Sequence, residues 1–194
     1  MRERCARGTP VVAVVGRSGA GKTSLLEELL PALSARGLRV AALKHASHGF
    51  LADRPGKDSH RIYESGACAV ALVSREQLAV FTRFDDPRGE PSLATALAAL
   101  PADLDLVLAE GFSWEPVPRI VVRGAGEAPS PEQLACGEVL SIVEGMPCPE
   151  RRRAVFPKSL VEALARELAT RVEAAPPGRN AREPSTASPE ACFP

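Results

Sequence analysis

The chain has 194 residues, 45% of them hydrophobic, and a formal net charge of zero at pH 7. This length and composition predict one domain with an adequate core, and the zero net charge excludes field-driven attraction to nucleic acid or to an anionic membrane. No apolar run approaches the roughly 20 residues that span a bilayer. We therefore expect neither a nucleic-acid nor a membrane partner.

The two ends of the chain differ in composition from its middle. Residues 1–9 are basic and contain no apolar stretch, which predicts a flexible start rather than a secretory signal. Residues 174–194 contain five prolines and no aliphatic periodicity, which predicts a disordered, proline-rich tail. Five dispersed cysteines without a C-x-x-C pair favour reduced thiols in a cytoplasmic protein. The predicted domain therefore covers 10–173.

Hydrophobic periodicity within that span alternates between strands and helices. The predicted strands lie at 10–15, 38–43, 68–74, 77–82, 104–109, 119–122 and 139–143. The predicted helices lie at 22–36, from Asp58 or Ser59 to 65, at 92–100, and from Pro157 onward, with a polar turn at 84–90. Ser159 and Glu162 have capping-box spacing in the last helix. The order predicts a three-layer α/β fold of the P-loop NTPase type, with a mostly parallel sheet and an antiparallel pair at 68–74 and 77–82.

The turn after the first strand matches the phosphate-loop pattern G-x-x-x-x-G-K-[ST] at 16–23, between the apolar run 11–15 and the leucine-rich segment 25–33. Backbone N–H groups of such a loop, and of the helix that follows it, surround phosphate oxygens. Lys22 is expected to reach the β- and γ-phosphates, and the Thr23 hydroxyl to bind Mg²⁺. The predicted nucleotide contacts here are Gly16, Ser18, Gly19, Ala20, Gly21, Lys22, Thr23 and Ser24.

Lys44 and His45 follow the second strand, at the edge of an open α/β sheet where ligands collect. The loop from 45 to 57 is too long for a simple connection, which favours a functional loop. Lys44, His45 and Lys57 are candidate nucleotide contacts. Asp53 and Asp58 are candidate catalytic residues, because their carboxylates could hold Mg²⁺ through water or position an attacking water.

A P-loop protein also needs an acidic group at the end of a neighbouring strand to hold Mg²⁺ or its water. Glu110 follows the buried strand 104–109, and we predict that it is this Walker-B-like residue and a metal site together with Thr23. The alternative is a capping or salt-bridge role for Glu110. Phe112 and Trp114, just beyond it, either line a partner surface or cover the sheet.

These motifs together resemble the molybdopterin-guanine dinucleotide biosynthesis adaptor protein B (MobB) family. The resemblance runs from about Val11 to Leu168, and the phosphate loop alone is common to many families. The combination with Asp53-Arg54-Pro55-Gly56-Lys57-Asp58-Ser59 is far more specific. The other matching segments are Leu29 to Leu33, Leu43-Lys44-His45 and Leu106 to Phe112.

The resemblance implies a GTP-binding, Mg²⁺-dependent adaptor with weak GTP hydrolysis that commonly forms a homodimer. It implies a partner too, a MobA-like guanylyltransferase that joins GMP to molybdopterin. GTP as the nucleotide is implied by the resemblance, since the sequence has no Asn/Thr-Lys-x-Asp motif to read guanine.

Other interpretations of the same residues remain open at this point. A small-molecule kinase would use ATP on the same loop, with Asp53 as the base, and a pure interaction module would bind nucleotide only to stabilise its fold. A zinc site from His45 and His48 is a weaker alternative, because a short H-x-x-H in a loop is weak evidence for zinc.

Overall fold

The computed structural model describes residues 8–47, 49–51, 53–84, 92–148, 150 and 153–175. The chain divides into two compact units, a first unit of 1–45 with 96–194 and a second unit of 46–95. The predicted span 10–173 therefore contains parts of both. Most of the predicted flexible start, the polar turn and the tail, as well as His48, lie outside the described residues.

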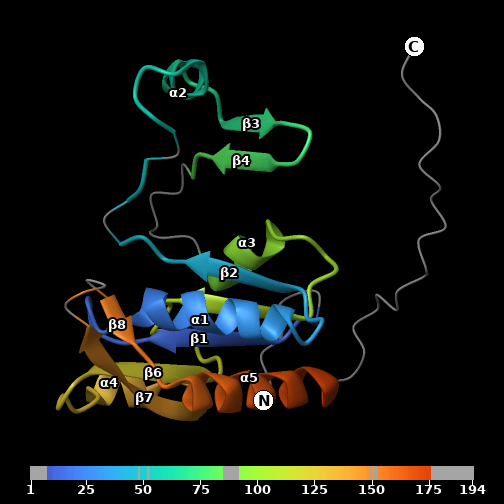
Figure 1. Ribbon diagram of the computed structural model, residues 1–194. Coiled ribbons are helices and arrows are strands. Elements are labelled where there is room, and N and C mark those ends of the chain that lie inside the picture. The colour runs from blue at the N-terminus through green and yellow to red at the C-terminus, as the bar shows by residue number, and fades with distance from the viewer. Residues whose placement is uncertain are drawn as a thin grey trace. The chain divides into compact units, whose positions relative to one another are not determined.

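The first unit is built on a six-stranded sheet with the order β2-β5-β1-β6-β7-β8 (Figure 1). Neighbouring strands are parallel except β7 and β8, which pair antiparallel. This arrangement confirms the predicted α/β fold with a mostly parallel sheet. The strands are β1 (Val11–Val15), β2 (Val40–Lys44), β5 (Leu106–Glu110), β6 (Arg119–Gly124), β7 (Val139–Cys148) and β8 (Arg153–Val155).

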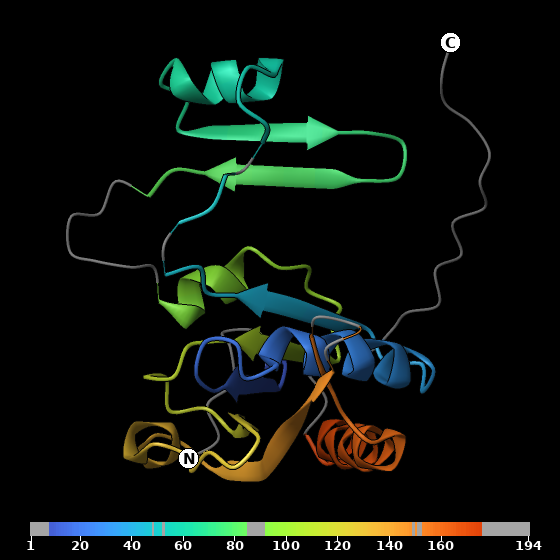
Figure 2. The same cartoon turned by 60° about the vertical axis from the view of Figure 1, so that its left-hand side comes forward.

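The core forms where the continuous apolar strands meet two amphipathic helices. Every residue of β1 and of β5 is buried, as expected for central parallel strands. Helices α1 (Lys22–Ser34) and α5 (Lys158–Glu173) contact one another and contribute leucines to one buried cluster (Figure 2). Burying each leucine stabilises the fold by roughly 1.5–3 kcal/mol. Among the described residues, no helix combines the length and the apolar character needed to span a membrane.

The predicted capping box of the last helix is wrong, whereas the predicted start of a helix at Asp58 is confirmed. Glu162 does not close a capping box at the start of α5, because its carboxylate accepts a 2.5 Å hydrogen bond from Arg36 at the end of α1. Helix α2 (Asp58–Glu64) is preceded by Lys57 as its N-cap, with no side-chain capping bond. In the first case an ion pair between helices competes with the local cap.

The sequence did not predict three features that lie between residues 131 and 155. Strand β7 runs to Cys148 and β8 pairs with it, while the short helix α4 (Pro131–Ala135) starts at a capping box between Ser130 and Gln133. A three-residue strand and a five-residue helix are too short for hydrophobic periodicity to indicate. Strand β8 forms because it pairs with β7, whereas α4 starts at a local capping box.

The second unit contains α2 and a β-hairpin. Strands β3 (Ala69–Val73) and β4 (Leu78–Thr82) pair antiparallel, which confirms the prediction. Arg83 lies over the Tyr63 ring of α2, 4.3 Å from its centroid, and also donates to the Tyr63 carbonyl. Helix α3 (Leu93–Ala98) lies across the division between the units.

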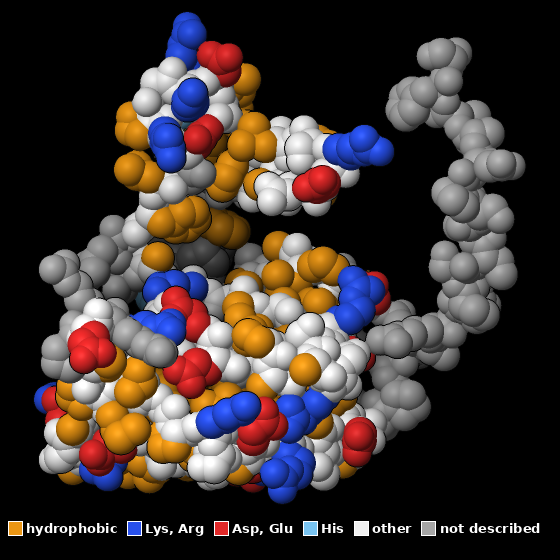
Figure 3. All heavy atoms as spheres, viewed as in Figure 1, with side chains coloured by type: hydrophobic (Ala, Val, Ile, Leu, Met, Phe, Trp, Pro, Cys, Tyr) orange, Lys and Arg blue, Asp and Glu red, His pale blue; other side chains and the backbone are white. Residues whose placement is uncertain are grey.

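One face of this hairpin is apolar and exposed. Val73 is paired with Leu78, and Ala71 with Val80. The side chains of Val73, Leu78 and Val80 are 77%, 67% and 57% exposed, and hydrophobic side chains are visible on the surface of this unit in Figure 3. The opposite face carries Val70, which is buried.

Candidate phosphate-binding site

The loop between β1 and α1 is packed so closely that glycine is required at two of its positions. A Cβ at Gly16 would lie 2.1 Å from the carbonyl oxygen of Val122 in β6. Gly21 has φ +101°, and a Cβ there would lie 2.5 Å from the Cβ of Ala154 in β8. Strands β6 and β8 therefore fix the path of the loop, and the predicted strand–loop–helix arrangement is confirmed.

The other predicted loop residues differ in their exposure. Ser18 and Gly19 are exposed, whereas Ala20 and Ser24 are buried. Ser24 lies in the first turn of α1, where backbone N–H groups have no partner within the helix. Its contribution to an anion would therefore come from the backbone rather than from the hydroxyl.

Lys22 folds back over the loop that precedes it. Its Nζ donates to the carbonyl oxygens of Gly16 at 3.0 Å and Arg17 at 2.8 Å. Burial lowers the pKa of Lys22 below its ordinary value of 10.5; nearby Glu110 opposes this shift and Lys44 adds to it. The ammonium therefore lies against the loop carbonyls, with part of its hydration removed.

Three side chains from separate elements meet beside the start of α1. The Thr23 hydroxyl donates to Glu110 Oε2 at 2.9 Å, and Lys44 Nζ lies 3.1 Å from Glu110 Oε1. Lys44 also donates to Thr23 Oγ1 at 3.2 Å. Glu110 is buried at the carboxyl end of β5, and Lys44 is opposite it at the end of β2. Glu110 thus has the position predicted for it and also forms the salt bridge considered as its alternative.

His45 connects this group to an aromatic cluster. The backbone N–H of His45 donates to the Glu110 carbonyl at 2.9 Å. The centroid of its ring lies 5.5 Å from that of Phe112 and 4.9 Å from that of Trp114. Phe112 is buried, with a left-handed φ of +53°, while Trp114 is half exposed. Phe112 therefore covers the sheet, and Trp114 is the member available at the surface.

Arg119 supports the loop that carries Trp114, a role that the sequence did not reveal. It is fully buried at the start of β6, and its two terminal nitrogens donate to the carbonyls of Ser113 at 3.0 Å and Glu115 at 2.6 Å. Its Nε has no hydrogen-bond partner among the described residues. An arginine directly before the apolar run Ile120–Val122 was the available signal.

Asp53, Lys57 and Asp58 belong to the second unit. Asp53 accepts hydrogen bonds from the Arg54 N–H at 2.6 Å and from the Ser59 hydroxyl, so it holds the turn that precedes α2. Asp58 lies 3.8 Å from Arg61 in an exposed pair. Their predicted roles at the phosphate loop remain predictions.

No group of three or more metal-ligating side chains occurs in the part of the chain that the structure describes. His48, on which the zinc alternative depends, lies outside that part.

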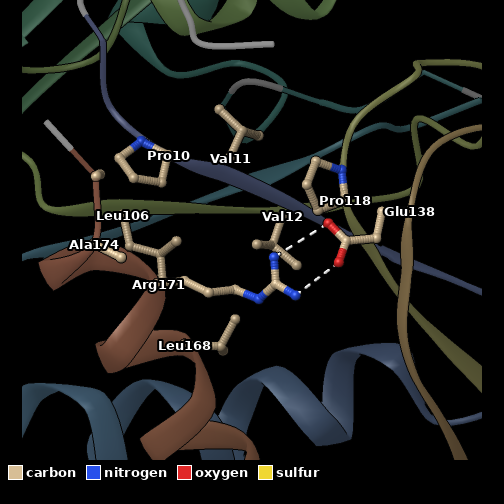
Figure 4. A pocket seen from close by; sticks show the side chains of 10 residues that line it. Pro10, Val11, Val12, Leu106, Pro118, Glu138, Leu168, Arg171 and Ala174 are labelled. Carbon is tan, nitrogen blue, oxygen red and sulfur yellow. Dashed lines mark hydrogen bonds and ion pairs between the residues drawn. The ribbon is translucent and has the colours of Figure 1, made fainter. Parts of the chain in front are cut away.

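The first unit also contains an apolar cavity of about 120 Å³ (Figure 4). It is lined by the first residues of β1 and β5, including Val11 and Leu106, and by the end of α5. Arg171 closes one side through hydrogen bonds of 2.8 and 3.2 Å to Glu138. Because the strands are parallel, this cavity lies at the edge of the sheet opposite the phosphate loop.

A family model described as molybdopterin guanine dinucleotide synthesis protein B matches residues 11–144. The chain is 35% identical over 139 residues to the molybdopterin-guanine dinucleotide biosynthesis adapter protein of Escherichia coli (strain K12), covering 71% of this chain and 79% of that protein. The protein of the same name from Haemophilus influenzae is 41% identical over 114 residues, covering 59% of this chain and 63% of that protein.

Solved structures agree with these matches. A crystal structure of molybdopterin-guanine biosynthesis protein B aligns with a TM-score of 0.59 at 30% identity, covering 84% of this chain and 99% of that one. A MobB homologue from Bacillus stearothermophilus aligns with a TM-score of 0.55 at 26% identity, covering 84% of this chain and 98% of that one.

Proposed function

The chain belongs to the molybdopterin guanine dinucleotide synthesis protein B (MobB) family, and we propose from this premise that it is a GTP-binding adaptor in the biosynthesis of molybdopterin guanine dinucleotide. The observation that carries the nucleotide part is the meeting of Thr23, Glu110 and Lys44 beside a glycine-constrained phosphate loop. Backbone donors, two ammonium groups and one buried carboxylate form a set that complements a triphosphate with its metal ion.

The donor set fits Mg²⁺ as well. The Thr23 hydroxyl and the Glu110 carboxylate are hard oxygen donors that lie 2.9 Å apart, and Mg²⁺ in phosphate sites needs only one or two protein ligands besides water and phosphate oxygens. When bound, the ion would neutralise phosphate charge. Lys22 and Lys44 would neutralise further charge, so Thr23 and Glu110 would hold the ion while the lysines would hold the phosphates.

Hydrolysis is proposed to be slow. Fast GTPases position the attacking water with a glutamine and stabilise charge with an arginine finger. The chain contains two glutamines: Gln133 closes the capping box of α4, and Gln77 lies in the hairpin turn of the second unit. Such a protein uses nucleotide to set its state rather than to drive rapid turnover.

The partner is a MobA-like guanylyltransferase that acts on molybdopterin, and the relatives' adapter names support this assignment. Trp114, half exposed beside the Glu110 group, offers an aromatic contact of the kind enriched in protein interfaces. The same names favour the adaptor over a small-molecule kinase.

A homodimer through the hairpin is part of the proposal. A two-stranded hairpin is marginally stable in water alone, and its exposed face of Ala71, Val73, Leu78 and Val80 is apolar. A second copy of the same face would cover these side chains by two-fold symmetry.

The test is an equilibrium titration of the full chain with fluorescent GTP and ATP analogues, with and without Mg²⁺. We expect Mg²⁺-dependent binding that prefers GTP, and loss of that binding in Lys22→Ala. Lys158→Ala removes an exposed charge of the same kind at the start of α5 and is the matched control. A preference for ATP would support the kinase, and unchanged GTP affinity in Lys22→Ala would refute the phosphate-loop assignment.

A further inference from the structure

The arrangement of the first unit determines which side of the phosphate loop a nucleoside must occupy. Glu110 and Lys44, the groups that suit the metal and the terminal phosphate, lie on β5 and β2, to one side of β1. Strands β6 and β7 lie on the other side of β1. A triphosphate with its terminal end toward Glu110 therefore directs its nucleoside toward the carboxyl ends of β6 and β7, where ligands of open α/β sheets bind.

A fixed turn lies at that place. The Glu127 N–H donates to the Gly124 carbonyl at 3.1 Å, and Gly126 has the left-handed φ of +73°. Arg123 joins the turn to both strands, because it donates to the Glu127 carbonyl at 2.7 Å and contacts Glu144 of β7 at 2.6 Å. The turn is thus held from β6 and from β7 at once.

The turn also adjoins the phosphate loop. Val15, the last residue of β1, is opposite Val121 in the sheet register. Gly16 then packs directly on the carbonyl of Val122. Arg123 and the turn follow within two residues of this contact, so the turn begins where the loop begins.

The side chain of Glu127 has an available carboxylate. A Cβ at Gly124 would lie 3.2–3.4 Å from its three carboxyl atoms, so the side chain folds back over the turn. Glu127 is exposed and makes no ion pair or side-chain hydrogen bond with the residues that the structure describes. A carboxylate beside a triphosphate site repels the ligand unless it accepts hydrogen bonds from it.

We propose that Glu127 is the residue that selects guanine, by accepting hydrogen bonds from the base's N1–H and exocyclic amino group. These two adjacent donors match the two oxygens of a carboxylate, and hydrogen bonds to a charged acceptor are the stronger kind. Adenine presents a lone pair at N1 and no amino group at C2, so it would leave the carboxylate unpaired. This inference rests on the proposed function. It explains how the chain could prefer guanine without an Asn/Thr-Lys-x-Asp motif.

The experiment compares GTP, ATP and XTP binding in the full chain and in Glu127→Gln. Xanthine has a carbonyl at C2 in place of the amino group, and the glutamine amide can donate to it. We expect the variant to lose about 10- to 100-fold of its preference for GTP over ATP, the range of one bidentate base contact. We also expect it to bind XTP more tightly than the unmodified chain does.

Glu132→Gln, five residues away on α4, removes the same charge and is expected to keep the original preference. Unfolding curves show whether each variant folds. If Glu127→Gln keeps its GTP preference and gains no XTP affinity while Lys22→Ala loses binding, the role of Glu127 is refuted and the proposed function stands. If the unmodified chain does not bind GTP, the proposed function itself fails, and the role of Glu127 with it.

Discussion

The two units use apolar residues in opposite ways. In the first unit, all five residues of β1 and all five of β5 are buried, and the leucines of α1 and α5 cover one face of the sheet. In the second unit, β3 contributes one buried residue and β4 none. The first unit therefore builds its stability internally, whereas the second keeps much of its apolar surface exposed.

This difference separates the two parts of the proposed function. The phosphate loop, Glu110 and Lys44 are held by buried strands, which position side chains more exactly than loops do. An exposed apolar face is typical of a surface that meets another chain. We infer that the first unit carries the nucleotide chemistry and that the second carries self-association.

The largest expected effect tests the internal core. Leu29→Ala removes a fully buried side chain from α1 and should lower the free energy of unfolding by about 2–5 kcal/mol, because a cavity remains. Ile62→Ala truncates an apolar residue of the second unit that is 53% exposed. This substitution should change the free energy of unfolding by less than about 0.5 kcal/mol. Urea denaturation measures both, and equal losses would remove the contrast between the units.

The next effect concerns the hairpin face. Val80→Lys places a charge in the centre of that face and should shift the protein from dimer to monomer, weakening association at least about tenfold, because a buried unpaired charge is costly. Size-exclusion chromatography with light scattering reports the mass. Gln77→Lys adds the same charge in the hairpin turn and should leave the dimer intact. A dimer that persists in Val80→Lys would exclude this face as the interface.

The smallest effect is a pH dependence from Lys22. Burial lowers the pKa of Lys22, so its ammonium loses its proton at a pH below the ordinary pKa of 10.5. The affinity for a triphosphate should therefore fall severalfold as the pH rises through that lowered pKa. The stability of the fold should change in the opposite direction over the same pH range. Loss of the proton removes the cost of burying the charge, so the free energy of unfolding rises with pH.

Inorganic tripolyphosphate is the suitable probe for this measurement, because guanine itself loses its N1 proton at alkaline pH. Lys22→Arg keeps its charge throughout and should show no such fall. An affinity for tripolyphosphate that stays level up to pH 10.5 would contradict the lowered pKa.

Local patterns were sufficient for much of the site. The strand–loop–helix around Lys22 follows from an apolar run, a glycine-rich turn and a leucine repeat, all within about 25 residues. Glu110 was identified because it ends a buried strand. By contrast, the pairing of Lys44 with Glu110 and the packing of Gly16 against Val122 join residues distant in sequence.

The sequence by itself determined the element types, the parallel core and the phosphate loop, because these depend on backbone preferences and on hydrophobic periods of a few residues. Only the tertiary structure decided which charges meet. It paired Glu162 with Arg36 instead of a helix cap, and it added β8 to the edge of the sheet. These outcomes depend on strand order and packing, which bring together groups that no local pattern relates.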